Sequence, residues 1–261
     1  MILFKHELKK GWKSLVIWTF AISFFLVVCV FLYPEMKGEM ENMNDMFSSM
    51  GAFTQAFGMD KINFGTWMGY YAIECGNVIG MGGAFFAAIL AVTALAKEEK
   101  DRTAEFLLSH PISRKRVITE KGIAVLVQIC IMNMIVFLLS IISMVCINVE
   151  ISWKEIFLLH FAYFLVQIVL AGICFGISAF ISGNGIGLGI GVATSMYFIN
   201  LVANITESAK DLKYITPFGF ADGASIVAEA ALNWKIVAVN MLFAIVGVVA
   251  AYTKYIKKDV S

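Results

Sequence analysis

The chain has 261 residues, of which 60% are apolar and only 15% are charged, and its formal net charge is +1. Soluble domains carry about 25% charged residues, so this composition excludes a water-soluble fold. No nucleic-acid partner is expected.

Six apolar runs are long enough to cross a bilayer, because a spanning helix needs about 20 residues. Backbone polar groups in lipid must be paired within the segment, and the alternation of a membrane β-barrel is absent, so the runs predict helices. We expect an all-α integral membrane protein with one transmembrane domain over residues 1–261. The predicted spans are 14–33, 72–96, 123–147, 156–181, 185–205 and 236–252.

The N-terminal segment, residues 1–13, is basic and amphipathic, with Lys5, Lys9, Lys10 and Lys13. The apolar run that follows is too long for a signal peptide and lacks an Ala-x-Ala cleavage pattern. We therefore expect a retained first span, preceded by a helix that anchors at the membrane interface.

The first outer connection, residues 34–71, carries methionines at helical spacing. Met36, Met40, Met43 and Phe47 follow one another at intervals of four and three residues, which predicts an amphipathic helix. Methionine adapts to varied apolar surfaces, so this face is a candidate lining for the exit of an apolar or amphipathic cargo. Packing on the ends of the membrane helices explains it as well. A Cu(I) site needs more than thioethers, and this helix has no His or Cys, so no metal site is predicted.

The inner connection, residues 97–121, is dense in charges of both signs. Ala104, Leu107 and Leu108 lie at positions i, i+3 and i+4, which gives a helix with a small apolar face, and Pro111 ends it. A short amphipathic helix at the membrane surface is suited to docking in a groove of another protein.

Small and polar residues inside the spans have two explanations each. Glycines recur at four-residue intervals, which allows close helix packing within the chain or in a dimer. Asn200 and Asn204, near the outer end of the fifth span, are candidates to line a path or to form caps and interhelical hydrogen bonds. Glu74 and His160 lie about one turn inside the outer ends of their spans, so we interpret them as interfacial residues rather than a proton relay. The glycines are Gly76, Gly80, Gly172, Gly176, Gly183, Gly187 and Gly191.

Basic residues predict that both termini are cytoplasmic. Most of the 20 Lys and Arg residues flank the N-terminus, the 97–121 connection and the C-terminus, as the positive-inside rule predicts for the cytoplasmic side. The outer side holds more acidic than basic residues, and its field would attract cationic peptides.

The sequence contains no recognisable nucleotide-binding motif that could power transport. The phosphate loop G-x-x-x-x-G-K-[ST] is absent, and the dipeptide Gly-Lys never occurs. No catalytic residue and no cofactor are predicted in this chain. A transporter without a nucleotide site indicates a partner that supplies the energy.

The 97–121 connection resembles the signature of type-2 ATP-binding-cassette permeases, a Glu-rich helix end followed by Thr-x-Glu-x-Leu-Leu-x-x-Pro-Ile-Ser-Arg and then a Lys that opens the third span. Arg102 departs from the pattern, because the family commonly has Gly there. Residues 4–10 and 255–260 are similar to the two ends of these permeases, so the resemblance covers essentially the whole chain. The matching positions are Glu98, Glu99, Thr103, Glu105, Leu107, Leu108, Pro111, Ile112, Ser113, Arg114 and Lys121.

The resemblance implies a multi-pass plasma membrane subunit with an elbow helix over 1–13 and a coupling helix that docks on a cytoplasmic ATPase. Two ATPase copies would bind ATP and Mg, and a second permease copy, identical or related, would complete the membrane domain. The family includes exporters of phenol-soluble modulins and peptide antibiotics, which implies a peptide cargo. The candidate coupling residues are Glu98, Glu99, Arg102, Thr103, Glu105, Leu107, Leu108, Ser109 and Arg114. The candidate path residues are Met36, Met40, Met43, Phe47, Asn200 and Asn204.

Two other classes of protein remain open from the residues alone. One is a membrane-embedded immunity or scaffold protein that binds partners without transport. The other is a carrier driven by a proton or sodium gradient.

Overall fold

The computed structural model describes residues 2–100 and 113–257, and the side chains of these except residues 2, 40–49 and 97–100. Six helical segments in this part are long and apolar enough to cross a membrane, which confirms the predicted all-helical, six-span fold. They are α1 (Ile2–Ser49), a second span made of α3 (Trp67–Tyr70), η1 (Tyr71–Cys75) and α4 (Gly76–Lys100), then α6 (Arg114–Cys146), α7 (Trp153–Ser178), α8 (Ile186–Ile205) and α10 (Trp234–Lys257).

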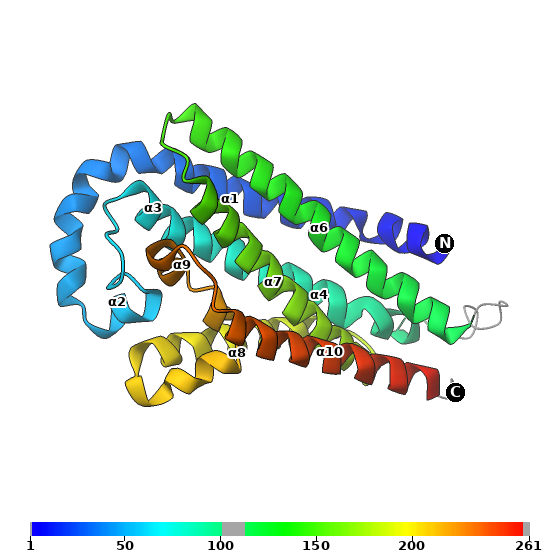
Figure 1. Cartoon of the computed structure of the whole chain (residues 1–261). Helices are drawn as coiled ribbons and strands as arrows, with labels where there is room; N and C mark the ends of the chain where they lie inside the picture. Colours follow the sequence, from blue (N-terminus) through cyan, green and yellow to red (C-terminus); the bar gives the residue numbers. More distant parts are fainter. Residues whose placement is uncertain (1, 101–112, 258–261) are drawn as a thin grey trace.

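The long helices run lengthwise through the molecule, and both termini lie at the same end (Figure 1). Helix α7 is the most buried span; it packs against both α4 and α10, while α1 packs against α6. The core of the bundle therefore lies around α4 and α7, and α8 and α10 present much of their surface outward.

The predicted spans each fall on one of these helical segments, and the third begins well before the predicted position 123. Helix α6 begins at Arg114 because Ser113 caps it: the Ser113 Oγ accepts a hydrogen bond from Arg116 N at 3.3 Å. The basic residues between positions 114 and 122 were expected in the inner connection. They instead form the first turns of α6.

Helix α1 is one uninterrupted helix of 48 residues. The described part of the expected elbow segment 1–13 and most of the expected methionine helix belong to it rather than to separate helices. Gly11 alone does not break a helix, and Pro34 lies inside it, where a proline removes one backbone hydrogen bond and bends the helix. Figure 1 shows α1 straight at first and curved in its later part.

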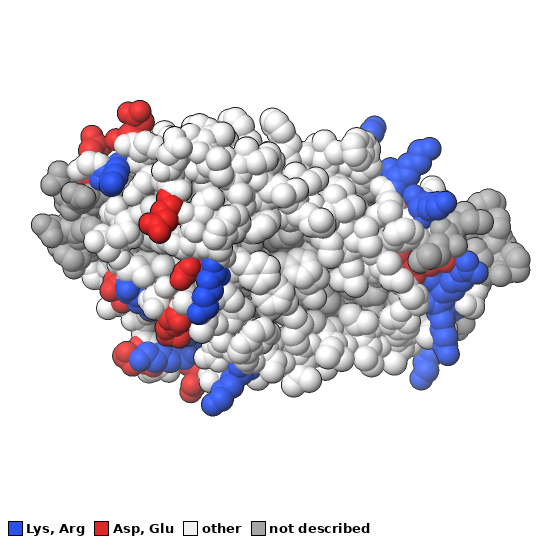
Figure 2. Space-filling view, turned by 45° about the horizontal axis from the view of Figure 1, so that its top comes forward, with Lys and Arg blue, Asp and Glu red and all other residues white. Residues whose placement is uncertain are grey.

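Charged side chains gather at the two ends of the molecule and leave an uncharged band between them (Figure 2). The end with the termini shows mainly Lys and Arg, whereas the opposite end shows both signs. We call these the basic end and, after the orientation that the sequence predicts, the outer end. A bilayer around the uncharged band fits the six apolar spans.

Close contact between α7 and α10 depends on glycine. A Cβ on Gly172 would lie 2.7 Å from Ala244 Cβ, and a Cβ on Gly176 would lie 2.7 Å from Gly247 O. The spacing of Gly172 and Gly176 therefore serves helix packing within the chain. Gly187 and Gly191 differ, because nothing lies within 4 Å of a Cβ at either position.

Short helices cover the outer end: α2 (Ala52–Phe57), η2 (Glu207–Tyr214), η3 (Pro217–Phe220) and α9 (Gly223–Glu229). Thr216 fastens this cover to the bundle, because its Oγ1 donates to Met196 O in α8 at 2.7 Å. The two long outer connections are thus structured, which their sequences did not predict beyond the methionine helix.

Candidate functional site

A buried lysine fastens three helices together at the basic end. The Lys121 side chain is 1% exposed, and its Nζ donates to Glu7 Oε1 and to Ala94 O, each at 2.9 Å. These contacts join α6 to α1 and to the last turns of α4. We call this group the Lys121 clamp.

A second contact beside the clamp holds the first turn of α1. The Glu120 carboxylate accepts a hydrogen bond from Phe4 N at 2.9 Å and another from Arg116 Nε at 2.8 Å. Glu120 is only 5% exposed. The start of α1, whose backbone N–H groups lack helical partners, is thus satisfied by a carboxylate from α6.

The predicted coupling segment begins and ends at these helices. Glu98 and Glu99 lie in the last turn of α4, and Arg114 is the first residue of α6, where its Nη1 donates to Ile256 O at 3.3 Å. The helix predicted between them lies outside the described residues. Its candidates there are Arg102, Thr103, Glu105, Leu107, Leu108 and Ser109.

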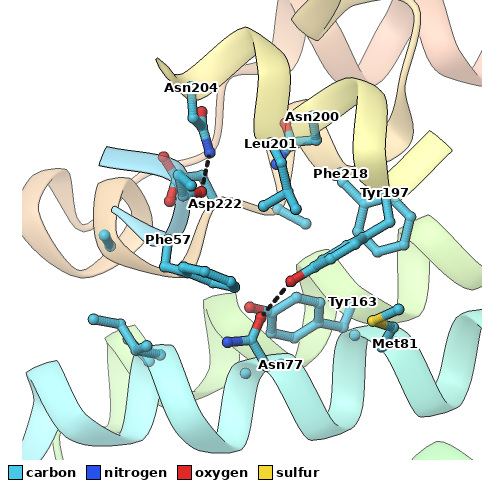
Figure 3. Close-up of a pocket in the computed structure, with 18 residues that line it drawn as sticks. Phe57, Asn77, Met81, Tyr163, Tyr197, Asn200, Leu201, Asn204, Phe218 and Asp222 are labelled. Carbon is cyan, nitrogen blue, oxygen red and sulfur yellow. Dashed lines mark hydrogen bonds between the residues drawn. The ribbon is translucent and has the colours of Figure 1, made fainter. Parts of the chain in front are cut away.

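A pocket lies at the outer end between α4, α7 and α8, and α2 and α9 close it (Figure 3). We call it the outer pocket. Its polar lining consists of amides, phenols and one carboxylate, with apolar side chains between them. Lining residues include Phe57, Asn77, Met81, Tyr163, Tyr197, Asn200, Leu201, Asn204, Phe218 and Asp222.

Hydrogen bonds hold part of this polar lining in place. Tyr197 OH donates to Asn77 Oδ1 at 3.3 Å, which joins α8 to α4. Asn200 is 7% exposed, and its Oδ1 has no hydrogen-bond partner among the described residues. The pocket can accept a donor group there, but its residues form no nucleophile, base and acid arrangement for covalent chemistry.

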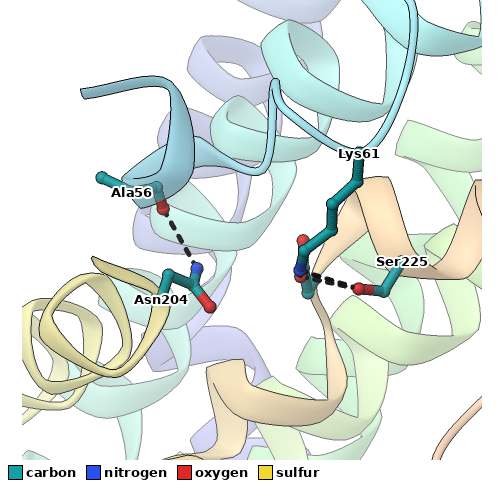
Figure 4. A network of polar contacts seen from close by, with 5 residues as sticks. Ala56, Lys61, Asn204 and Ser225 are labelled. Atoms are coloured by element: carbon teal, nitrogen blue, oxygen red, sulfur yellow. Dashed lines mark hydrogen bonds and ion pairs between the residues drawn. The ribbon is translucent and has the colours of Figure 1, made fainter. Parts of the chain in front are cut away.

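Two polar contacts connect the outer pocket to its cover (Figure 4). Asn204 Nδ2 donates to Ala56 O at 3.0 Å, so this candidate path residue makes an interhelical hydrogen bond. Lys61 Nζ pairs with Asp222 and donates to Ser225 Oγ at 3.0 Å. Nearby, partial burial and the charge of Lys61 lower the pKa of Lys213.

The methionine face is only partly described. Met36 is half-buried and packs against the cluster of Tyr33, Phe64, Tyr70 and Ile73, which supports its packing role. Met40, Met43 and Phe47 lie in α1, but their side chains fall outside the description.

His160, which was expected near the membrane interface, is buried within the bundle, with 7% of the residue exposed. Its Nε2 lies 2.8 Å from Tyr71 OH, which also contacts Ser140 Oγ at 2.5 Å, and the Phe137 ring meets it edge-on. Tyr71 begins the π-helical turn η1, which also contains the half-buried Glu74. Burial within the bundle places His160 among polar partners that sequence position did not reveal.

Sequence reasoning missed three important contributors to these sites. Sequence analysis recognised Lys121 only as a position of the family motif. A lysine close to an apolar membrane span is nevertheless a candidate for a buried ion pair. Tyr163 and Tyr197 gave no signal of their own. Gly76 and Gly80 were the clue to Tyr163, since a Cβ on either would lie within 3 Å of its side chain.

The molecule has six spans and a polar pocket at one end. At the other end, the two helices that flank the connection between the second and third spans are joined to each other. The family model described as ABC-2 family transporter protein matches residues 1–260, and the chain belongs to this family. It is therefore a multi-pass plasma membrane protein and the membrane component of a transport system, and its family implies association with an ABC ATPase. Comparison with curated proteins finds no match.

Proposed function

We propose that this chain forms the substrate path of an ATP-driven exporter and couples to a separate cytoplasmic ATPase through residues 97–121. The observation that carries the proposal is the Lys121 clamp, which fastens both helices that flank this segment to each other and to α1. A displacement of the segment by an ATPase would therefore move α4, α6 and α1 together. ATP and Mg belong to the partner, since the chain has no phosphate loop.

Two copies of the ATPase and a second permease, identical or related, would complete the assembly. Coupling in this proposal needs apolar anchors on the docking helix, and Leu107 and Leu108 supply them in the sequence. Glu98, Glu99 and Arg114 would flank the docking surface.

The proposed cargo is an amphipathic or hydrophobic peptide, a toxin or an antimicrobial peptide. The resemblance to exporters of such peptides supports this class, and so does an outer side richer in acidic than in basic residues, which favours cationic peptides. The candidate path runs toward the outer pocket, where Asn200 and Asn204 contribute amide groups.

Co-purification with a candidate ATPase tests the coupling. We expect the wild-type chain to retain the ATPase in detergent and the double variant Leu107→Asp, Leu108→Asp to lose it, because buried apolar anchors do not tolerate charge. The matched control is Met50→Asp, at an exposed position in the turn between α1 and α2 and outside the spans, which should retain the ATPase. Equal retention by the double variant would refute the assigned docking helix.

Transport by the assembled complex separates the exporter from its rivals. In sealed vesicles that contain the chain and its ATPase, an amphipathic peptide should accumulate only when ATP is supplied on the ATPase side. Accumulation driven by an ion gradient without ATP would favour the carrier. Retention of the peptide or the ATPase without any transport would favour the scaffold or immunity protein.

A further inference from the structure

A membrane-facing groove in the half of the bundle near the basic end is distinct from the outer pocket. Helices α6 and α10 form its walls, with Leu126 and Ile245 among the exposed side chains, and Ala171 and Gly172 of α7 form its floor. Its volume is about 980 Å³ with its open side included, and almost all of its lining is apolar. We call it the inner groove.

The length of the inner groove corresponds to one leaflet. On α10 the lining runs from Met241 to Tyr252, which is about 16 Å at 1.5 Å per residue. Half of a bilayer's hydrocarbon core is about 15 Å thick. The groove thus has the length of one acyl chain extended from the membrane surface to the midplane.

The inner groove is open toward the membrane along its length and narrow at one end. At the basic end Thr119 Oγ1 and Tyr252 OH lie 2.7 Å apart and bridge α6 to α10. A flexible chain that enters sideways from the membrane fits this geometry, and the oligomeric state of the groove-filling variants below distinguishes it from a helix of a second copy.

Among the described residues, the charged side chains of α6 around this bridge are mainly basic. Lys115 lies one turn before Thr119, whose Oγ1 donates to Lys115 O at 2.7 Å, and its side chain is exposed. Arg114 extends from α6 to Ile256 O near the end of α10. The neighbouring carboxylate, Glu120, instead accepts from Phe4 N of α1 and from Arg116. A negatively charged headgroup at the level of Thr119 would therefore meet cations from α6.

From the length, the apolar lining and these cations we infer that the inner groove binds an anionic glycerophospholipid of the leaflet at the basic end. One acyl chain lies between α6 and α10, and the headgroup phosphate lies beside Arg114 and Lys115. Basic sites between membrane helices on the cytoplasmic side are a recognised way to hold anionic lipid headgroups. The bound chain adds to the packing of α10, whose largest contact is with α7.

Spin-labelled lipids in nanodiscs test this site in the full-length chain. Spin-labelled phosphatidylglycerol should show an immobilised component that exceeds that of spin-labelled phosphatidylcholine. The double variant Arg114→Gln, Lys115→Gln should lower this preference by about fivefold for each cation removed. Equal immobilisation of the two lipids by the wild-type chain would overturn the anionic assignment.

Filling the groove gives a second, independent readout. Gly122 lines the groove, and a Cβ there would lie 3.6 Å from the Phe175 ring, an ordinary contact, so the position admits a side chain and we expect Gly122→Trp to fill the groove. It should remove the immobilised component, and Leu126→Trp, from the same wall, should do the same. The matched control is Gly187→Trp, at an open position on α8, which should retain the wild-type signal.

Two results would refute the lipid site. One is an immobilised component of wild-type size in both groove-filling variants. The other is a change of oligomeric state in these variants with no loss of bound lipid, which would assign the groove to a second copy of the chain. Retention of the ATPase by Gly122→Trp is expected and keeps this test separate from the coupling proposal.

Discussion

The contact between α7 and α10 gives the most direct quantitative prediction. In Gly176→Ala the new methyl group would lie 2.7 Å from Gly247 O and 2.8 Å from Gly247 Cα. Both are backbone atoms, so no side-chain rotation can relieve the overlap. Since an ordinary contact begins near 3.4 Å, α10 must move away from α7 by about 0.7 Å.

The cost of this separation follows from packing. A gap of 0.5–1 Å forfeits about a quarter to a half of each dispersion contact across the interface, and overpacked sites typically cost about 1–3 kcal/mol. We therefore expect Gly176→Ala to reduce the free energy of unfolding by about 2 kcal/mol, although alanine is the better helix former.

Steric trapping of the protein in detergent or bicelles measures this difference. Gly191→Ala is the matched control, because nothing lies within 4 Å of its new methyl group. It should be neutral or stabilising by up to about 1 kcal/mol through helix propensity. Equal stability of Gly176→Ala and Gly191→Ala would refute the argument that glycine sets the distance between α7 and α10.

Three further predictions concern polar groups. Lys121→Met should reduce the free energy of unfolding by about 2–4 kcal/mol, less than the loss of a fully buried pair, because Glu7 can reach water. In an assembled complex it should also uncouple ATP hydrolysis from transport. Unchanged coupling would contradict the role of the Lys121 clamp. Tyr71→Phe should cost about 1–3 kcal/mol, measured by the same trapping assay, because His160 loses its hydroxyl partner. Burial lowers the pKa of Lys213 in the folded state below 10.5, the value for the unfolded chain. Between the two pKa values the folded state binds fewer protons than the unfolded state, so the free energy of unfolding should rise with pH in this range. Melting curves of Lys213→Met should lack this rise and show higher stability below it.

The sequence was sufficient for the spans because each is a long apolar run, and the membrane requires its backbone to be helical. Helix ends were harder, since α6 begins at a serine cap within a charged stretch that hydropathy assigns to the connection. The expected elbow segment and the first span form one continuous helix, because nothing near Lys13 interrupts it.

The candidate sites depended on pairings between distant residues, which a single sequence does not encode locally. Lys121 and Glu7 are 114 positions apart, and Asn204 meets the carbonyl of Ala56 from 148 positions away. The position of His160 in its span predicted its depth in the membrane, but not that its side of α7 faces Tyr71 and Phe137. The rotation of α7 about its axis decides which side chains face the bundle. All sides of α7 are similarly hydrophobic, so the sequence does not predict this rotation.

The unbroken course of α1 has a mechanical consequence. A helix of 48 residues is about 72 Å long, more than twice the thickness of the hydrocarbon core. Because no loop interrupts α1 between Glu7 and Tyr33, a tilt of the helix at Glu7 is transmitted to Tyr33. A proline removes one backbone hydrogen bond, so α1 can bend at Pro34. The segment after Pro34 can therefore keep its contacts at the outer end while the part before it tilts.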